Sequence, residues 1–422
     1  MRRLLEESFR AAVAAADPLA VLGPQLPKPP RGRTLVVGAG KAAASMAVAV
    51  EREWPGGAPL EGLVLTRYRH ALPTARIRVI EAGHPVPDDA GEAGAHEILR
   101  RAAGLAEDDL LIALFSGGGS SLLSLPAADV CMADLKAVTT QLLRCGAAIQ
   151  EINAVRKHLS AIQGGRLAAA CRAEVVALII SDVTGDDPTH IASGPCAPDP
   201  TTYRDALDVL ARYRVTPPPA VRKRLEDGAA GRVAETPKPG DAVFARVRNR
   251  VVATAHRSLQ AAAETFRAAG VAPVILGDTV TGEASEVAKV FAALVREVRR
   301  YGAPFAPPVA LISGGECTVT LRAEGGRGGR CSEFLLALSI ELEGIDGVYA
   351  IAADTDGIDG SEDNAGALFG PDTAARARSA ELEPRRYLAA NDSYGYFAAL
   401  GDLVVTGPTL TNVNDYRAIV VV

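Results

Sequence analysis

The stretch Thr34-Leu35-Val36-Val37-Gly38-Ala39-Gly40-Lys41-Ala42-Ala43 decides the fold class of this chain. Its apolar run predicts a buried strand, its glycines predict a tight turn, and the alanine-rich continuation predicts a helix. A strand, a glycine turn and a helix in this order open a βαβ unit, and the free N–H groups at the start of the helix favour an anion. We therefore expect an α/β protein that binds an anion beside Gly38 and Gly40.

The same rhythm of apolar runs and alanine-rich helical stretches continues along most of the chain. Most runs are continuous rather than alternating, which is typical of strands buried on both faces of largely parallel sheets. The expected strands are 34–37, 62–66, 76–81, 110–115 and 175–181 in the first half, and 251–253, 273–276, 309–312, 347–352 and 403–406 in the second. The final segment, 417–422, is expected to add a strand to one of the two domains.

A length of 422 residues fits two domains better than one. The stretch 214–241 is rich in proline and is the expected inter-domain linker, because proline suits extended connections better than sheet interiors. The boundary is expected near residue 235, with a Rossmann-like parallel-sheet domain at 1–235 and a smaller α/β domain at 236–422. A shorter proline-rich connection is expected at 301–308.

The composition excludes several classes of function. A formal net charge of −5 and an aromatic content of only 5% argue against nucleic acid as a partner. The six cysteines are scattered and include no CxxC pair, which indicates free thiols in a reducing compartment. Residues 1–22 predict an amphipathic helix rather than a signal peptide, and no apolar run reaches the roughly 18 residues of a membrane span. We expect a cytoplasmic protein with no membrane partner.

Lys41 adds a positive charge to the first glycine turn. A lysine at the start of a helix opposes the helix dipole, and a bound anion would remove that conflict. The turn is not a Walker A loop, but it fits the relaxed dinucleotide fingerprint GxGxxA with Ala43 as its last member. The next expected strand is followed by Arg67, Tyr68 and Arg69 rather than by the carboxylate that would hold a ribose. This disfavours NAD, although a phosphorylated ribose is not excluded.

A second glycine loop follows the expected strand at 110–115. Consecutive glycines allow a ligand to approach the main chain, and flanking serines add hydroxyl groups. We expect this loop to wrap phosphate oxygens or a substrate carboxylate, with the candidate nucleotide-binding residues Ser116, Gly117, Gly118, Gly119, Ser120 and Ser121. Ser193 and Gly194, in the run Ala192-Ser193-Gly194-Pro195, are further candidates.

Three adjacent basic residues, Arg156, Lys157 and His158, lie in an expected helix. Successive helical residues are about 100° apart, so the three cannot share one face. The sequence leaves open which of them faces a site.

Carboxylates supply the candidate metal ligands. Asp182 follows the expected strand at 175–181, where open α/β sheets place ligands, and it could bind Mg²⁺ or accept a proton from a substrate hydroxyl. Asp356 lies in Asp354-Thr355-Asp356-Gly357-Ile358-Asp359-Gly360, which resembles the start of an EF-hand loop. The closing position is Ala365 rather than Glu, so calcium sensing is rejected and Asp356 is kept as a candidate for Mg²⁺ or substrate.

The second half adds groups that complement an anion. Gly314, Gly315 and Glu316 follow the expected strand at 309–312, Arg330 follows a glycine-rich turn, and Asn414 lies in a polar loop. A guanidinium at Arg330 could clamp a phosphate bidentately. Glycine loops, Lys41, Arg330 and aspartates are the components of phosphoryl transfer, which depends on positioning and charge neutralisation. No GxSxG or HExxH motif points to a hydrolase.

In order along the chain, VGAGKAA, SGGGSSLL, INAVRKHLSAIQGGRLA, SDVTGDDP, IASGP, SGGE, GGR, DGIDG and TNVND closely resemble the class of glycerate kinases with a C-terminal MOFRL domain. The resemblance spans residues 5 to 417. It implies phosphorylation of D-glycerate to 2-phospho-D-glycerate with ATP and Mg²⁺, in a cleft between a Rossmann-like domain and a smaller MOFRL domain. It also implies that Lys41 and Arg330 are the charged active-site residues.

The chain departs from the family pattern at Cys331-Ser332, where relatives have Asn-Gln, and at Leu410, where they have glycine. The acceptor could therefore be a relative of glycerate. The alternative enzyme is a hydroxypyruvate reductase using NAD(P)H, and a sensor without turnover is a third interpretation. The sequence does not determine the oligomeric state, for which a homodimer is one expectation.

Overall fold

The computed structural model describes residues 1–322, 325–343 and 345–422. These residues form two compact units, which we call the β1–β6 unit (residues 18–252) and the β7–β12 unit (residues 1–17 and 253–422). This division differs from the boundary expected near residue 235. The chain starts in the β7–β12 unit, forms the β1–β6 unit and then returns to the β7–β12 unit.

A six-stranded sheet forms the centre of the β1–β6 unit, in the order β3-β2-β1-β4-β5-β6. Its strands are β1 (Thr34–Ala39), β2 (Glu61–Arg67), β3 (Ile77–Ala82), β4 (Leu110–Phe115), β5 (Glu174–Ile180) and β6 (Val247–Ala253). Strands β1 to β5 pair in parallel, as the continuous apolar runs predicted. The strand order reverses between β1 and β4, and ligands bind at such a switch point in open α/β sheets.

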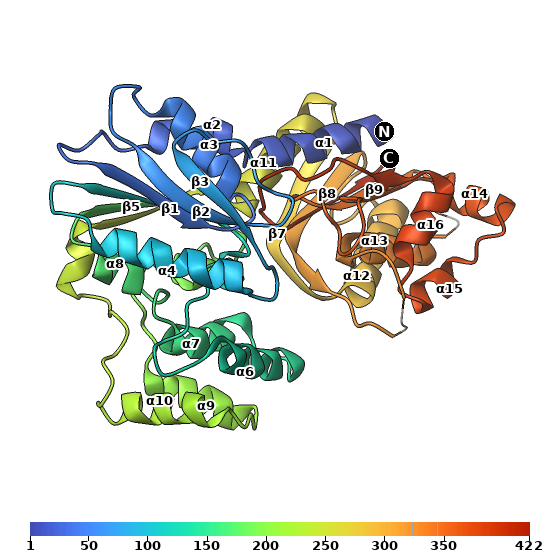
Figure 1. Cartoon of the computed structure of the whole chain (residues 1–422). Coiled ribbons are helices and arrows are strands. Elements are labelled where there is room, and N and C mark those ends of the chain that lie inside the picture. The colour runs from blue at the N-terminus through green and yellow to red at the C-terminus, as the bar shows by residue number, and fades with distance from the viewer. Residues whose placement is uncertain (323–324, 344) are drawn as a thin grey trace. The chain divides into compact units, whose positions relative to one another are not determined.

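Helices cover both faces of this sheet (Figure 1). They are α2 (Pro18–Val21), η1 (Gly23–Gln25), α3 (Ala43–Glu53), α4 (Asp89–Ala103), α5 (Gly119–Leu122), α8 (Arg166–Ala170), η2 (Ile191–Ser193) and η3 (Ala242–Arg246). Ala95 and Ile98 of α4 and Leu167 of α8 join the strand side chains in one apolar cluster. Burial on both faces explains why the strands read as unbroken apolar runs.

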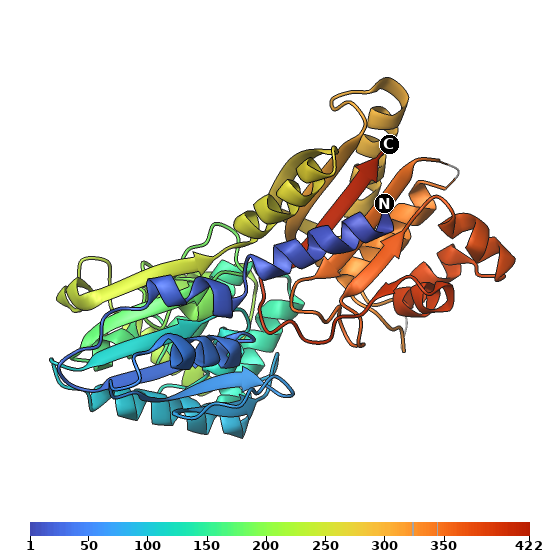
Figure 2. The ribbon, with the colours of Figure 1, turned by 90° about the horizontal axis from the view of Figure 1, so that it is seen from above.

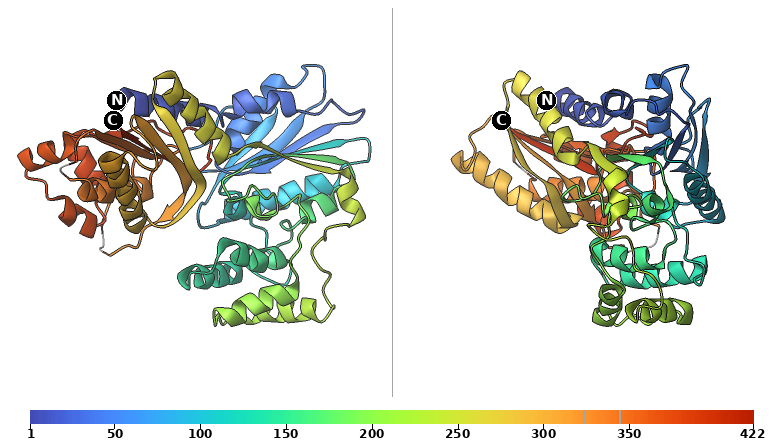
Figure 3. Two further views of the ribbon diagram at one scale, coloured as in Figure 1. Left: turned by 180° about the vertical axis from the view of Figure 1, so that it is seen from behind. Right: turned by 90° about the vertical axis from the view of Figure 1, so that its left-hand side faces the viewer.

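Four further helices form a layer beneath α4 in Figures 1 and 3. They are α6 (Met132–Arg144), α7 (Ile149–Leu159), α9 (Tyr203–Arg212) and α10 (Pro219–Ala229). Helix α10 falls inside the stretch 214–241, so the expectation of an extended linker there is wrong. Pro219 stands in the first turn, where proline is tolerated, and Val221 and Leu225 are buried in the core of this layer.

The β7–β12 unit contains a mixed sheet in the order β11-β10-β9-β12-β8-β7. Its strands are β7 (Ala272–Glu283), β8 (Val309–Thr318), β9 (Val348–Asp354), β10 (Gly366–Phe369), β11 (Leu403–Val404) and β12 (Asp415–Val421). Only β7 and β8 pair in parallel, so the prediction of largely parallel sheets fails here. The final strand inserts between β8 and β9 and runs antiparallel to both, which a period-based prediction cannot detect.

Helices again cover both faces of this second sheet. They are α1 (Arg2–Ala14), α11 (Ala255–Ala268), α12 (Ala284–Tyr301), α13 (Arg330–Glu341), α14 (Thr373–Ser379), α15 (Pro384–Ala389) and α16 (Ser393–Leu400). The predicted amphipathic helix at the N-terminus is α1, which lies along this sheet in Figure 2. Leu5 and Phe9 are buried with residues of α11 and β12, and the Tyr416 hydroxyl donates to Ser8 at 2.8 Å. This packing explains why residues 1–17 belong to the second sheet.

Within the described ranges, none of the helices combines the length and apolar character needed to cross a bilayer. All six cysteines are free thiols, as their spacing predicted.

Candidate functional site

In the β1–β6 unit, the two glycine loops lie side by side at the switch point of the sheet. They follow the adjacent parallel strands β1 and β4. The backbone N–H of Lys41 donates to the Gly117 carbonyl at 2.8 Å, and the N–H of Ala42 donates to Ser116 Oγ at 3.0 Å. Gly40 has a φ of +145°, and a Cβ there would lie 2.1 Å from Ser116 Oγ, so only glycine fits. Two motifs whose contacting residues Ala42 and Ser116 are 74 positions apart in sequence are thus joined by hydrogen bonds.

Lys41 lies against the second of these loops. It precedes α3 and is half-buried, and a Cβ placed on Gly118 would lie 3.4 Å from its Cγ. The same Cβ would lie 2.8 Å from Cδ2 and Nε2 of His84, so the imidazole borders the loop as well. Gly118 itself has a φ of +79°, which favours glycine. Lys41 and His84 therefore both border the second glycine loop. The anion-binding role of Lys41 stays a prediction, and His84 was not singled out in the sequence.

Ser120 of the second loop belongs to a buried chain of hydrogen-bonded side chains. Ser193 Oγ is 2.8 Å from Ser120 Oγ and 3.1 Å from Asn153 Oδ1. Ser193 and Asn153 are almost fully buried, and Ser193 has a φ of +60°. A non-glycine residue in this conformation is strained, and such strain is often associated with binding sites. Ser193 thus lies next to Ser120, and Asn153 is an additional member of this chain.

Asp182 lies two residues beyond β5 and is half-buried. Its position at the carboxyl end of a parallel strand agrees with the expectation for a ligand-binding carboxylate. Gly38 is the residue before the end of β1, where a Cβ would lie 2.3 Å from the Leu114 carbonyl oxygen of β4. Gly38 therefore serves close strand pairing, and Gly40 rather than Gly38 forms the turn.

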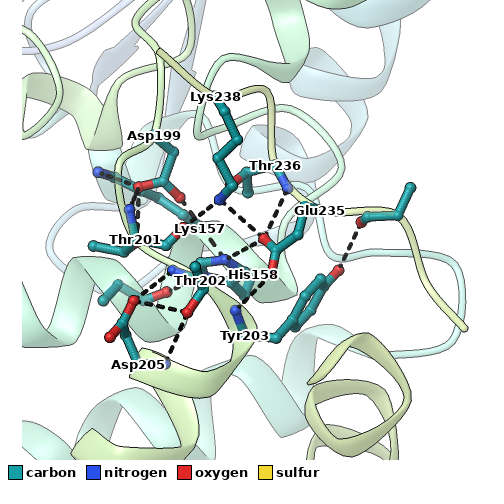
Figure 4. A network of polar contacts seen from close by, with 12 residues as sticks. Lys157, His158, Asp199, Thr201, Thr202, Tyr203, Asp205, Glu235, Thr236 and Lys238 are labelled. Atoms are coloured by element: carbon teal, nitrogen blue, oxygen red, sulfur yellow. Dashed lines mark hydrogen bonds and ion pairs between the residues drawn. The ribbon is translucent and has the colours of Figure 1, made fainter. Parts of the chain in front are cut away.

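The basic triplet on α7 separates into different environments. Lys157 and His158 are fully buried in a network that links α7 to the segments 199–205 and 235–238 (Figure 4). Lys157 Nζ is 3.4 Å from Asp199 Oδ1, and His158 Nε2 is 3.2 Å from Glu235 Oε2. These two basic residues hold the helical layer together.

Charges in this network shift one another's pKa. Burial opposes ionisation of Asp199, but the ammonium of Lys157 and hydrogen bonds from Thr201 hold the pKa of Asp199 below its ordinary value. Burial also opposes ionisation of Glu235, yet hydrogen bonds from His158 and from the Tyr203 N–H lower the pKa of Glu235 to about 2. Both carboxylates therefore stay ionised at neutral pH. We infer that the network is structural, because its charges satisfy each other.

In the β7–β12 unit, Arg330 is held between two carboxylates. Its Nε donates to Asp415 Oδ1 at 2.7 Å, and its Nη2 donates to Asp354 Oδ2 at 2.7 Å. Asp354 ends β9 and Asp415 begins β12, where they are cross-strand neighbours. Burial disfavours the charge, but the two carboxylates raise the pKa of Arg330 well above its ordinary value. The guanidinium is thus fixed in place and always charged.

Gly314, Gly315 and Glu316 do not form the expected turn, because β8 runs through them to Thr318. Gly315 faces an irregular part of the pairing with β7, where a Cβ would lie 2.2 Å from the Val280 carbonyl oxygen. Glycine is therefore needed here for strand packing rather than for a phosphate loop. The side chain of Glu316 is exposed and lies 3.5 Å from Arg330.

Asp356 and Asn414 lie in loops next to β9 and β12, the strands that carry Asp354 and Asp415. Asp356 is buried and accepts the Ile358 N–H at 2.9 Å, and Asn414 lies beside the start of β12 in a left-handed conformation. Among the described residues no group of three or more His, Cys, Asp or Glu side chains is arranged to hold a metal. Magnesium commonly takes only one or two protein carboxylates, with phosphate and water as its other ligands. Asp182 and Asp356 therefore stay predicted magnesium ligands.

Cys331 and Ser332, where the chain departs from the family pattern, lie in the first turn of α13. Both side chains are buried at the start of α13. Their N–H groups donate to the carboxylate of Asp359 at 2.9 and 2.8 Å, and the Ser332 hydroxyl donates to it as well. Asp359 therefore caps this helix, which explains one of the carboxylates in the loop that resembles an EF-hand.

Glu333, the next residue on α13, is an unusual buried acid. Burial raises the pKa of Glu333 to about 7, although the Asn391 amide donates to it at 3.2 Å. The folded protein therefore binds this proton more tightly than the unfolded chain does, and stability is lost as the pH rises from about 4.5 to about 7.

We expect Glu333→Gln to leave stability unchanged near pH 4.5 and to raise it by up to about 3 kcal/mol above pH 7, because glutamine cannot ionise. Urea unfolding at several pH values measures this difference. Glu264→Gln is the matched control, since its carboxylate is 70% exposed. An equal effect of Glu333→Gln at pH 4.5 and pH 8 would contradict the prediction.

Comparisons with known proteins agree with the motif order. Residues 4–226 match the family described as a domain of unknown function, DUF4147, and residues 309–415 match the MOFRL family. An Agrobacterium vitis protein named "Putative hydroxypyruvate reductase" is 52% identical over 100% of this chain and 94% of its own length. A D-glycerate 2-kinase from Thermotoga maritima is 37% identical over 98% of this chain and 97% of its own length.

A solved structure supports the same relationship. The crystal structure of a glycerate kinase from Thermotoga maritima superimposes with a TM-score of 0.87 at 36% identity, covering 100% of this chain and 99% of the other. The similarity therefore extends to the whole of both units.

Proposed function

Because this chain belongs to the family of glycerate kinases with DUF4147 and MOFRL regions, we propose that it transfers the γ-phosphoryl group of ATP to the 2-hydroxyl of D-glycerate. The single observation that carries the proposal is the joined pair of glycine loops at the switch point, with Lys41 against them. A lysine beside flexible backbone N–H groups is suited to triphosphate oxygens.

Each predicted residue has a role in this reaction. Ser116 to Ser121 would bind phosphate oxygens through N–H and hydroxyl groups, and Lys41 would neutralise charge that develops on the transferred phosphoryl group. Asp182 would accept the proton of the acceptor hydroxyl or hold magnesium, and Asp356 is the predicted magnesium ligand of the β7–β12 unit. When bound as its magnesium complex, ATP supplies the phosphoryl group. Arg330 would contribute through the acidic residues that it orients. The location of the reaction in a cleft between domains stays a prediction.

The reductase alternative has one observation in its favour, which is the name of the Agrobacterium vitis relative. The residues after β2 oppose it, because Arg67 ends the strand and no carboxylate follows to hold a ribose. The fingerprint GxGxxA also has another explanation here, since Gly40 is required by the approach of Ser116.

A coupled assay separates the two enzymes. With Mg-ATP and D-glycerate we expect ADP release that depends on glycerate, and with NADPH or NADH and hydroxypyruvate we expect no oxidation of the cofactor. Chelation of magnesium should abolish ADP release and recovery should follow its return. Oxidation of NAD(P)H without ADP release would overturn the kinase proposal.

A further inference from the structure

Within the part of the chain that the structure describes, the side chain of one of the three basic residues on α7 has no partner. Lys157 and His158 pair with carboxylates of the buried network, so Arg156 is the remaining basic residue of the triplet. Among the described residues the Arg156 side chain makes no hydrogen bond and no ion pair. Its side chain is half-buried, and burial alone lowers the pKa of Arg156 to about 10, so it still carries its charge at neutral pH.

A charged guanidinium that is partly removed from water without a counter-ion is unfavourable for the empty protein. Charged groups that burial perturbs in this way are concentrated at functional sites. Arginine presents its donors in a planar fork that matches a carboxylate or a phosphate bidentately. The state of Arg156 therefore points to an anionic ligand.

The position of Arg156 connects it to the glycine loops. Asn153 precedes it by three residues, so the two side chains are neighbours on the surface of α7. The Asn153 amide lies 3.1 Å from the Ser193 hydroxyl, which in turn lies 2.8 Å from Ser120 of the second glycine loop. This part of α7 thus borders the site already described.

The segment that α7 contacts here also has unmet polar groups. The Asn153 amide lies 3.5 Å from the His190 carbonyl oxygen, which ties the helix to the segment 189–194. Within the described structure, Thr189 Oγ1 and His190 Nδ1 are buried without a hydrogen-bond partner. Ala192 and Ser193 both adopt strained left-handed conformations. Buried unsatisfied groups and backbone strain together indicate a ligand-binding segment.

We infer that Arg156 binds the carboxylate of D-glycerate and thereby selects a hydroxy acid as the acceptor. This inference rests on the proposed kinase function and deepens it. Lys41 is a point charge against the glycine loops, which suits phosphate oxygens, whereas the planar fork of Arg156 beside a chain of hydroxyl and amide groups suits a small hydroxycarboxylate.

The test compares Arg156→Ala and Arg156→Lys with the wild type in steady-state kinetics. We expect Arg156→Ala to raise KM for D-glycerate at least tenfold while KM for ATP changes less than twofold. The KM of Arg156→Lys for D-glycerate should lie between the values of the wild type and of Arg156→Ala, because lysine keeps the charge but lacks the planar, bidentate donors of arginine. Arg222→Ala on α10 is the matched control, since Arg222 is exposed. An unchanged KM for D-glycerate, or a rise in KM for ATP alone, would overturn the inference.

Thermal shift without nucleotide distinguishes this inference from the kinase proposal. The wild type should gain thermal stability with D-glycerate but not with glycerol, which lacks the carboxylate. Arg156→Ala should be at least as stable as the wild type without ligand and should lose the response to D-glycerate. This pattern supports the role of Arg156 even if ADP release is absent and the kinase proposal fails. An equal response to D-glycerate in both proteins, or no response in the wild type, would reject it.

Discussion

Lys41→Ala should lower kcat/KM for D-glycerate by roughly 100-fold or more, as the loss of one charge-stabilising contact typically does. The Lys41 side chain lies beside Gly118, in the loop that we propose to bind the transferred phosphoryl group. The fold should tolerate the change, because Lys41 precedes α3 and the loops are joined by backbone atoms and by Ser116. Steady-state kinetics with Mg-ATP and D-glycerate measures the effect.

Lys28→Ala is the control for Lys41→Ala, since Lys28 is exposed in the same unit. Near-wild-type kinetics in a folded Lys41→Ala protein would remove this residue from the mechanism. Arg330→Ala is a less specific test. It would leave Asp354 and Asp415 without their shared cation, so a loss of activity would report on folding as well as on chemistry.

Asp199→Ala should destabilise the protein by about 3–5 kcal/mol, the typical result of removing one partner of a buried ion pair. Lys157 would keep its charge in the interior after losing the carboxylate at 3.4 Å, and the two donors on Thr201 would lose their acceptor. Because the pKa of Asp199 is lowered on folding, its contribution is present above pH 3.8 and is lost as the pH falls further. Urea unfolding at pH 7 measures the difference.

Lys223→Ala is the control for the buried pair, because its ion pair with Asp227 involves a lysine that is 76% exposed. We expect that control to cost less than about 1 kcal/mol. The double variant Lys157→Met/Asp199→Asn should recover part of the loss, since no unpaired charge stays buried. If Asp199→Ala and Lys223→Ala were equally stable, the network in Figure 4 would not be the structural element that we infer.

The sequence predicted the first sheet better than the second for a physical reason. Strands β1, β2 and β4 are buried on both faces, and continuous apolar runs mark such strands clearly. Strand β10 has only four residues, Gly366–Phe369, so its apolar run is too short to identify a strand by period. The stretch 214–241 was interpreted as a linker because proline dominates it locally, whereas long-range packing of Val221 and Leu225 makes part of it helical.

Prediction of the candidate site was likewise limited to features that local sequence patterns reveal. Local glycine patterns were sufficient to identify Gly40 and Ser116–Ser121, because these motifs follow strands directly. They were misleading at Gly315, where the glycine serves a bulge against Val280. The partners of Lys157 and His158 are 42 and 77 residues away along the chain, so no local pattern could have assigned them. Nor could a local pattern have shown that, among the described residues, the Arg156 side chain pairs with neither carboxylate.

The central claim, phosphorylation of the 2-hydroxyl of D-glycerate, is tested most directly by a proton-coupled ³¹P NMR spectrum of the product. Carbon 2 carries one proton and carbon 3 carries two. We predict a phosphate signal that is a doublet, from coupling to the single proton on carbon 2. A triplet would show transfer to the 3-hydroxyl, and the absence of any new phosphate ester would contradict the kinase function itself.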